Sequence, residues 1–257
     1  MADASATDKS IPTNLRLLLL LEEIATVGVP VTPTAANEVL GLPKATVHRL
    51  FHRLEQEGFL QRDIDGRSYS AGLRLRKMAV NVLSSSRVRS VRLAVLNALT
   101  EDIGETCNIA TPERDGMVYL DRVETKWPLR IQLPIGTTVP FHCTASGKMY
   151  LSTLAPRMLS KYLSAAILDQ HTPKTLTQPE DVHREIEKIR VNGYSTDNEE
   201  FMDGMVAIAV PIMDDLGRMM STLSVHAPTQ RISMSELQGH LDRLVRAATD
   251  LSEIALR

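Results

Sequence analysis

The feature that most constrains the fold is a change of hydrophobic period at Gly58. Before this glycine, apolar residues recur at helical spacing from about Pro43 to Glu57, with Val47 and Leu54 on one face. After it, two short segments with a period of two flank the sequence Asp63-Ile64-Asp65-Gly66, which is typical of a β-hairpin. A helix that leads directly into a hairpin is therefore expected here.

Two shorter helices are expected upstream, over about residues 15–28 and 34–40, with Thr34 as the N-cap of the second. Gly41 permits the left-handed backbone of a tight turn. Pro43 suits the first turn of the next helix, because its missing N–H costs nothing there. The order helix, helix, turn, helix, hairpin predicts a winged helix-turn-helix.

The helix after the turn is basic on its exposed face, as a helix that reads double-stranded DNA requires. Lys and Arg outnumber Asp and Glu in residues 1–92, whereas acidic residues predominate in the remainder of a chain with net charge −2. An ordinary amphipathic helix with a solvated basic face is the alternative. The predicted DNA contacts are Lys44, Ala45, Thr46, His48, Arg49 and Arg53 on the helix and Arg62 and Arg67 on the hairpin.

The rest of the chain alternates short strands and helices, which predicts an α+β unit with an antiparallel sheet. The expected strands are 106–111, 117–123, 129–133, 206–212 and 219–225, and the expected helices are 146–154, 156–163, 179–192 and 234–256. The predicted boundaries are a disordered tail at 1–12, the winged helix-turn-helix at 13–83, a linker helix at 84–103 and a second domain at 104–257.

Composition suggests a cytoplasmic protein. The first residues are polar and do not resemble a signal peptide, and the apolar run at 17–21 is far short of a membrane helix. Two cysteines are too few for a disulfide framework.

Several segments resemble, in the correct order, landmarks of the IclR family of bacterial transcriptional regulators. They are GLPKATVHRLFHRLEQEGFLQRD (41–63), YLDRVE (119–124), HCTASGK (142–148), GYSTDNEE (193–200) and LSVHAP (223–228). The resemblance implies a C-terminal effector-binding domain of GAF-like α/β shape. It also implies homodimers or homotetramers on palindromic operators, and control by a small metabolite, often an organic or aromatic acid.

A helix is expected to start in the run Thr144-Ala145-Ser146-Gly147-Lys148, where backbone amides between small side chains can hold a carboxylate. Simple N-capping by Thr144 or Ser146 is the ordinary explanation of this run. The resemblance adds Asp197, Ala207, Ser224 and His226 to the effector site, with Cys143, Met117 and Leu129 as further candidates. Core packing is an equal explanation for Met117 and Leu129. The family often has a smaller hydroxyl residue at the position of His226 and frequently has alanine at that of Cys143, so the resemblance does not identify the effector.

Two other functions fit parts of the sequence. His142, Cys143, Asp197 and His226 contain the groups of a Cys–His nucleophile or a metal site, but their spacing matches no compact motif. We therefore expect no enzyme, no cofactor and no metal. A sensor whose N-terminal unit docks protein instead of DNA is the other possibility. The resemblance implies a repressor of a catabolic operon or, as the alternative, a ligand-responsive activator, depending on operator position.

Overall fold

The computed structural model describes residues 11–63, 65–83 and 86–255. The chain divides into two compact units, residues 1–83 and 84–257. Most of the predicted disordered tail, residues 1–10, lies outside the described residues. Within the described part of the chain, no helix combines the length and apolar character needed to cross a membrane.

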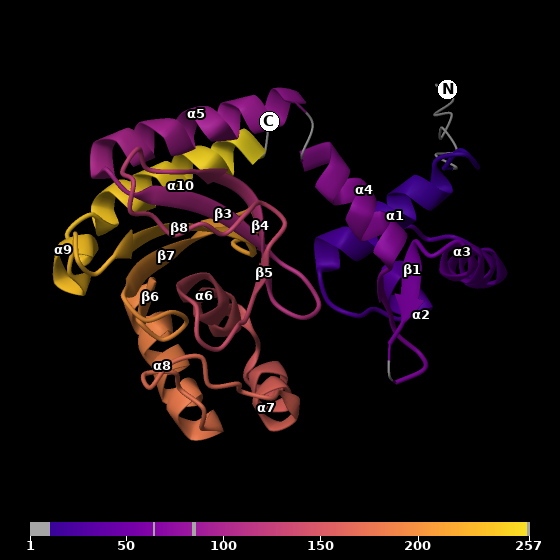
Figure 1. The fold of residues 1–257 in the computed structure, drawn as a ribbon. Coiled ribbons are helices and arrows are strands. Elements are labelled where there is room, and N and C mark those ends of the chain that lie inside the picture. The colour runs from indigo at the N-terminus through magenta and orange to yellow at the C-terminus, as the bar shows by residue number, and fades with distance from the viewer. Residues whose placement is uncertain (1–10, 64, 84–85, 256–257) are drawn as a thin grey trace, which may run out of the picture. The chain divides into compact units, whose positions relative to one another are not determined.

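The N-terminal unit has the predicted order of elements (Figure 1). These elements are α1 (Arg16–Val27), α2 (Pro33–Ala36), α3 (Lys44–Gln56), β1 (Leu60–Arg62), β2 (Tyr69–Ala71) and α4 (Leu73–Leu83). β1 and β2 pair antiparallel, and Val31 extends this wing by a bridge to Tyr69. Gly58 adopts a positive φ of 74°, which stops α3 and turns the chain into the wing. The winged helix-turn-helix is therefore confirmed.

The second helix is shorter than predicted, and its N-cap is Thr32 instead of Thr34. Thr32 lies in extended backbone before Pro33, as a residue preceding proline prefers, and its Oγ1 accepts a hydrogen bond from Ala35 N at 3.2 Å. Asn37 then ends the helix, because its side chain bonds both the N–H and the carbonyl of Leu42. These side-chain bonds hold the tight turn before α3.

The C-terminal unit is built on a six-stranded antiparallel sheet in the order β5-β4-β3-β8-β7-β6. Its strands are β3 (Thr106–Pro112), β4 (Met117–Val123), β5 (Thr138–Val139), β6 (Ser195–Asn198), β7 (Met205–Met213) and β8 (Met219–Pro228). Its helices are α5 (Ser86–Ile103), α6 (Ala145–Thr153), α7 (Pro156–Ala165), α8 (Pro179–Asn192), α9 (Met234–Gln238) and α10 (Leu241–Ala255). The antiparallel α+β architecture is confirmed.

Three details of this unit differ from prediction. The strand expected at 129–133 is wrong: the segment is a loop, and Arg122 donates to the carbonyl of Ile131. The sequence analysis missed β5 and β6, which have two and four residues, too few for a periodic signal. The helix expected at 234–256 is two helices separated at Gly239 and His240.

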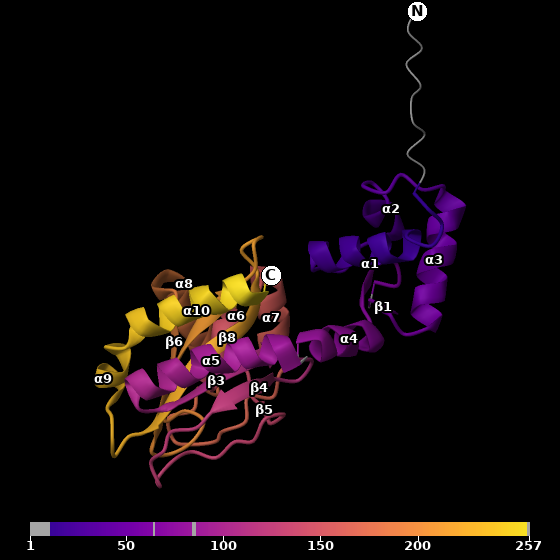
Figure 2. The same ribbon diagram turned by 90° about the horizontal axis from the view of Figure 1, so that it is seen from above.

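The two faces of the sheet have different characters. One face carries Val206, Ile208 and Val225, and it packs against α5 and α10 in a large apolar core (Figures 1 and 2). The other face is covered by α6, with α7 and α8 beyond it (Figure 1). Because strand residues alternate between faces, the second face receives every other residue of the same strands. On β8 they are the polar residues Ser224 and His226, whereas on β7 they are the alanines Ala207 and Ala209.

The helix expected to link the units is anchored to the sheet by a buried ion cluster. Arg89 and Arg92 of α5 bind the two carboxylate oxygens of Asp121 at 2.9 and 2.7 Å. Asp121 is fully buried on β4, next to a bulge in the β3–β4 pairing. The bulge places Asp121 on the α5 side while its neighbour Arg122 bonds Asn108 on the opposite side.

Candidate functional site

The first candidate surface is the outer face of α3. Val47 and Phe51 bury the inner face of the helix in the core of the N-terminal unit. The predicted contacts on the outer face are exposed (Lys44, Ala45, His48, Arg49 and Arg53) or half-buried (Thr46). Among the described residues, no carboxylate lies within ion-pair distance of Lys44 or Arg49. Both cations are therefore available to a polyanion.

The other predicted basic contacts differ in how strongly they are engaged. Arg53 is paired with Glu57 at 3.1 Å, and both side chains are largely exposed. Arg62 donates to both carboxylate oxygens of Glu55 at 3.0 and 2.8 Å and lies over the Tyr69 ring, so it ties the wing to α3. Arg67 is exposed at the wing. All the predicted DNA contacts stay predictions, and Arg62 differs from Lys44 and Arg49 in that Glu55 already engages it in an ion pair.

The second candidate site is the sheet face beneath α6. Strand pairing brings residues from four strands into two cross-strand rows on this face. The first row is Thr106, His226, Ala207 and Asp197, and the second is Asn108, Ser224, Ala209 and Ser195. All eight residues are buried, and we call them the polar face. Three predicted effector residues, Asp197, Ala207 and His226, are direct neighbours in the first row, and Ser224 lies in the second.

The N-terminal turn of α6 lies above this face. Thr144 caps the helix by accepting a hydrogen bond from Gly147 N at 3.0 Å, and its own hydroxyl donates to Pro140 O at 2.7 Å. Gly147 packs so closely that an added Cβ would lie 2.4 Å from Phe141 Cα and O. The capping explanation therefore holds for Thr144. The Thr144 hydroxyl accepts from the backbone N–H of Gly147 only, so the backbone N–H groups of Ala145 and Ser146 have no acceptor within the helix.

Five buried polar atoms near these elements lack a hydrogen-bond partner in the described part of the chain. They are Asn108 Nδ2, Ser146 Oγ, Ser195 Oγ, Asp197 Oδ2 and His226 Nδ1. Four belong to the polar face and the fifth to the first turn of α6. Buried polar groups are normally satisfied, and an unpaired group costs about 1–3 kcal/mol. Such a concentration is typical of a site that receives a polar ligand.

The pKa values of both titratable groups of the polar face are shifted in the direction that favours the neutral form. Burial, together with repulsion from Glu200, raises the pKa of Asp197 to about 7, even though its Oδ1 accepts hydrogen bonds from the N–H groups of Glu200 and Phe201. Burial and the nearby Arg122 lower the pKa of His226 to about 3. Nε2 of the neutral His226 ring lies 3.2 Å from Ser224 Oγ, within hydrogen-bonding distance. A neutral carboxyl and a neutral imidazole can both face an anion without like-charge repulsion.

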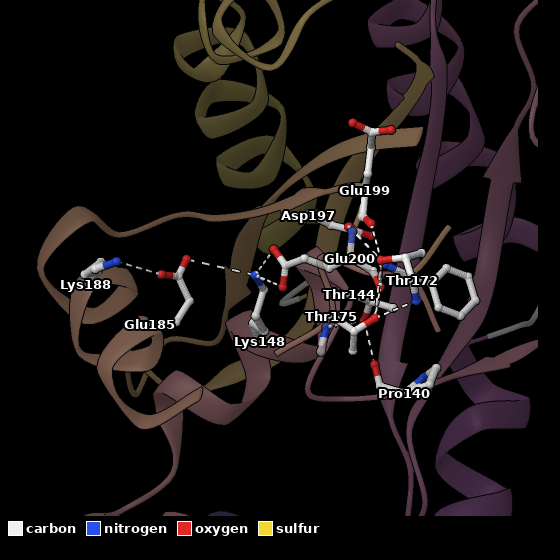
Figure 3. A network of polar contacts seen from close by, with 12 residues as sticks. Pro140, Thr144, Lys148, Thr172, Thr175, Glu185, Lys188, Asp197, Glu199 and Glu200 are labelled. Atoms are coloured by element: carbon white, nitrogen blue, oxygen red, sulfur yellow. Dashed lines mark hydrogen bonds and ion pairs between the residues drawn. The ribbon is translucent and has the colours of Figure 1, made fainter. Parts of the chain in front are cut away.

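A buried ion pair supports the site from α6 (Figure 3). Lys148 is fully buried, and its Nζ lies 2.5 and 2.7 Å from the carboxylate oxygens of Glu200 and 3.9 Å from Glu185. The carbonyl of Glu200 also accepts a hydrogen bond from Thr175. Sequence reasoning missed Lys148 and Glu200 as a pair and did not single out Asn108. The only sequence signal for this pair was the position of Lys148, directly after the small residues at the start of the helix.

The remaining candidates are dispersed. Met117 is buried in the core beside α6, whereas Leu129 is 59% exposed on the loop after β4.

Burial raises the pKa values of Cys107 and Cys143 to about 12, so neither thiol is an available nucleophile near neutral pH. In the described residues, no group of three or more His, Cys, Asp or Glu side chains is arranged to hold a metal ion.

Comparison with known proteins gives matches along most of the chain. Residues 15–63 match the IclR helix-turn-helix domain, and residues 80–253 match the bacterial transcriptional regulator IclR C-terminal domain. The probable transcriptional regulator SauR of Cupriavidus necator is 37% identical over 237 residues, covering 92% of this chain and 94% of the relative. The transcriptional repressor IclR of Escherichia coli is 28% identical over 254 residues, covering 98% and 92%.

A crystal structure of IclR from Thermotoga maritima has the same fold, with a TM-score of 0.62, 27% identity and coverage of 94% of this chain and 97% of that one. The matched families and relatives are transcriptional regulators, not enzymes. The resemblance seen in the sequence is therefore confirmed. The chain belongs to the IclR family of bacterial transcriptional regulators, and α3 lies within the segment that matches the helix-turn-helix domain of this family.

Proposed function

We propose that this protein is a cytoplasmic repressor of a catabolic operon, which binds a palindromic operator as a homodimer or homotetramer and is controlled by a small organic acid. The observation that carries the ligand part is the group of five unpaired buried polar atoms between α6 and the polar face. An activator controlled in the same way is the second candidate. The two differ in operator position, which the chain does not encode.

The ligand carboxylate is assigned to the first turn of α6. The amides of Ala145 and Ser146, which have no intrahelical acceptor, and the positive end of the helix dipole favour an anion there, and Ser146 Oγ adds an unpaired donor. When protonated on Oδ2, Asp197 can also donate a hydrogen bond to the ligand. His226 Nδ1 and Asn108 Nδ2 are available to polar groups elsewhere on the ligand.

Replacing Ser146 by alanine is expected to weaken binding of the acid by about ten-fold, because one hydrogen bond to a charged group is lost. The stability of the ligand-free protein should stay the same or rise, since the hydroxyl removed is already unpaired. Thermal shift and calorimetry with acetate, lactate, succinate and benzoate would measure both quantities.

Ser152→Ala is the matched control for this experiment. Ser152 lies on the same helix and is also buried, but its hydroxyl donates to Met149 O at 2.6 Å. Its replacement should leave ligand affinity unchanged. If none of the four acids stabilises the wild type at millimolar concentration, or if both variants bind equally well, the site is wrongly placed.

Replacing Arg49 or Lys44 by alanine is expected to weaken operator binding by ten-fold or more while the fold is retained, because both side chains are exposed on α3. A variant that loses a phosphate contact should also show a shallower salt dependence, by about 0.9 in the logarithmic slope. Fluorescence anisotropy on a site selected from random duplexes gives both readouts.

Lys77→Ala removes the same charge from an exposed position on α4 and serves as the control. Equal losses in Lys44→Ala and Lys77→Ala would show that only the overall charge of the unit matters. With saturating ligand, a repressor that is released by its effector should bind the operator more weakly. Tighter binding would instead favour regulation by a co-repressor or activation.

A further inference from the structure

A second cavity, of about 670 Å³, lies beside α7 and shares no lining residue with the polar face or with α6. Its walls come from the β3–β4 connection at 114–115, β5, the segment 140–142, the end of α7 and the loop at 166–171. The volume falls within the range of small-molecule sites, about 300–1,000 Å³. The regulatory function proposed above makes no use of this cavity.

The lining combines apolar and aromatic side chains with four exposed charged or titratable ones, Arg114, Asp115, Asp169 and His171. The rings of Phe141 and Tyr162 meet edge to face with centroids 5.9 Å apart. Val139 and Ala165 add aliphatic surface, and the side chain of Ile167 at the cavity is left 84% exposed. Aromatic walls of this kind favour a flat ring, which can stack or meet them edge to face.

One polar group of the lining has a defined hydrogen-bonding state. His142 is 3% exposed, and its Nε2 lies 3.0 Å from the carbonyl oxygen of Asp169. Because a carbonyl only accepts, Nε2 must carry the proton. Burial lowers the pKa of His142, so the ring is neutral and Nδ1 is an acceptor. Among the lining residues, His142 thus has a ring nitrogen that can accept a hydrogen bond from a hydroxyl donor.

The wall that carries His142 is held in place before any ligand arrives. Thr144 Oγ1 donates to Pro140 O at 2.7 Å, and Phe141 packs closely against the backbone of Gly147. A preformed wall reduces the entropy lost on binding.

We propose that this cavity is a second small-molecule site, which takes a neutral phenol. The ring lies against Phe141 and Tyr162, and the hydroxyl donates to His142 Nδ1. The site is separate from the carboxylate site under α6, and it does not depend on the regulatory function proposed for that site.

Phenol itself is the probe, and anisole, which lacks the donor, is its comparison. In calorimetry and saturation-transfer NMR with the full chain, phenol is expected to bind about ten-fold more tightly than anisole, the value of one hydrogen bond. His142→Phe keeps a ring but removes the acceptor, so the preference for phenol should disappear.

Two substitutions on α7 locate the site. Ala165→Trp places an indole at a lining position and should weaken phenol binding at least ten-fold. Ala155→Trp makes the same change at the exposed N-cap of the same helix, outside the lining, and should leave binding unchanged. Both positions are exposed, so both variants should fold.

Several outcomes would overturn the proposal. They are no phenol binding to the wild type, equal binding in the two tryptophan variants, and retention of the phenol preference in His142→Phe. Loss of phenol binding in Ser146→Ala would also overturn it, because the phenol would then occupy the carboxylate site. Failure of carboxylates to bind, with phenol still bound, would leave this second site standing.

Discussion

Replacing Lys148 by methionine is expected to lower the free energy of unfolding of the C-terminal unit by about 3–5 kcal/mol. The ammonium group is fully buried and lies 2.5 and 2.7 Å from the oxygens of Glu200. Methionine preserves much of the aliphatic stem but leaves the Glu200 carboxylate buried without its partner. An uncompensated buried charge costs far more than the net value of the pair itself. Urea unfolding monitored by circular dichroism measures the loss.

The double variant Lys148→Met/Glu200→Gln should recover most of this stability, because no unpaired charge then remains. Lys188→Met is the matched control: Lys188 binds Glu185, the same residue that Lys148 approaches, but its side chain is 69% exposed. The expected cost there is at most about 1 kcal/mol. Equal losses in Lys148→Met and Lys188→Met would contradict the buried pair.

The second large effect concerns pH. The pKa of Asp197 is raised to about 7 from an ordinary value of 3.8, so the folded state holds this proton more tightly than the unfolded state does. The contribution of protonated Asp197 to the free energy of unfolding is therefore fully present below about pH 4, and it is lost as the pH rises from about 4 to 7. The loss is at most about 1.4 kcal/mol per pH unit.

Asp197→Asn removes this titration but keeps an oxygen to accept the N–H groups of Glu200 and Phe201. Between pH 5 and 7, the stability of the wild type relative to the variant should fall by up to about 1.4 kcal/mol per unit. Unfolding at pH 5, 6 and 7 measures the difference. A constant difference across these values would mean that Asp197 is already ionised at pH 5.

Asp214→Asn is the control for the pH experiment. Burial acts to raise the pKa of Asp214, but hydrogen bonds from Arg218 and Leu216 outweigh it, so the net pKa is lowered. Stability from Asp214 is lost only as pH falls below the ordinary range of an aspartate. Its replacement should leave the slope between pH 5 and 7 unchanged.

The N-terminal unit could be predicted closely because turn residues and hydrophobic spacing within a few residues specify each of its elements. Gly58 ends α3 and turns the chain into the wing, and the helical spacing of Val47 and Leu54 identifies the buried face. The N-cap of α2 was misplaced by two residues because two threonines flank Pro33, and only the structure shows that the hydroxyl of Thr32 accepts the hydrogen bond from Ala35 N. Turn chemistry and hydrophobic period act over a few residues, so a single sequence contains them.

The ligand site was predicted only in part. Resemblance and the small residues at 144–147 indicated the start of α6, and the structure adds that Thr144 occupies the amide of Gly147. The polar face depends on the register of β6, β7, β8 and β3, which brings Asp197, His226 and Asn108 together from distant parts of the chain. No local period encodes such a register.

The change of period at Gly58 by itself determined that this chain carries a helix that runs into a wing, because each element is specified by its own short stretch of residues. Tertiary structure alone decided which polar groups are buried without partners, that Lys148 meets Glu200, and that His142 lines a cavity. The physical reason is that burial and pairing are properties of residues brought together by folding. They do not exist until strands and helices distant in sequence have packed.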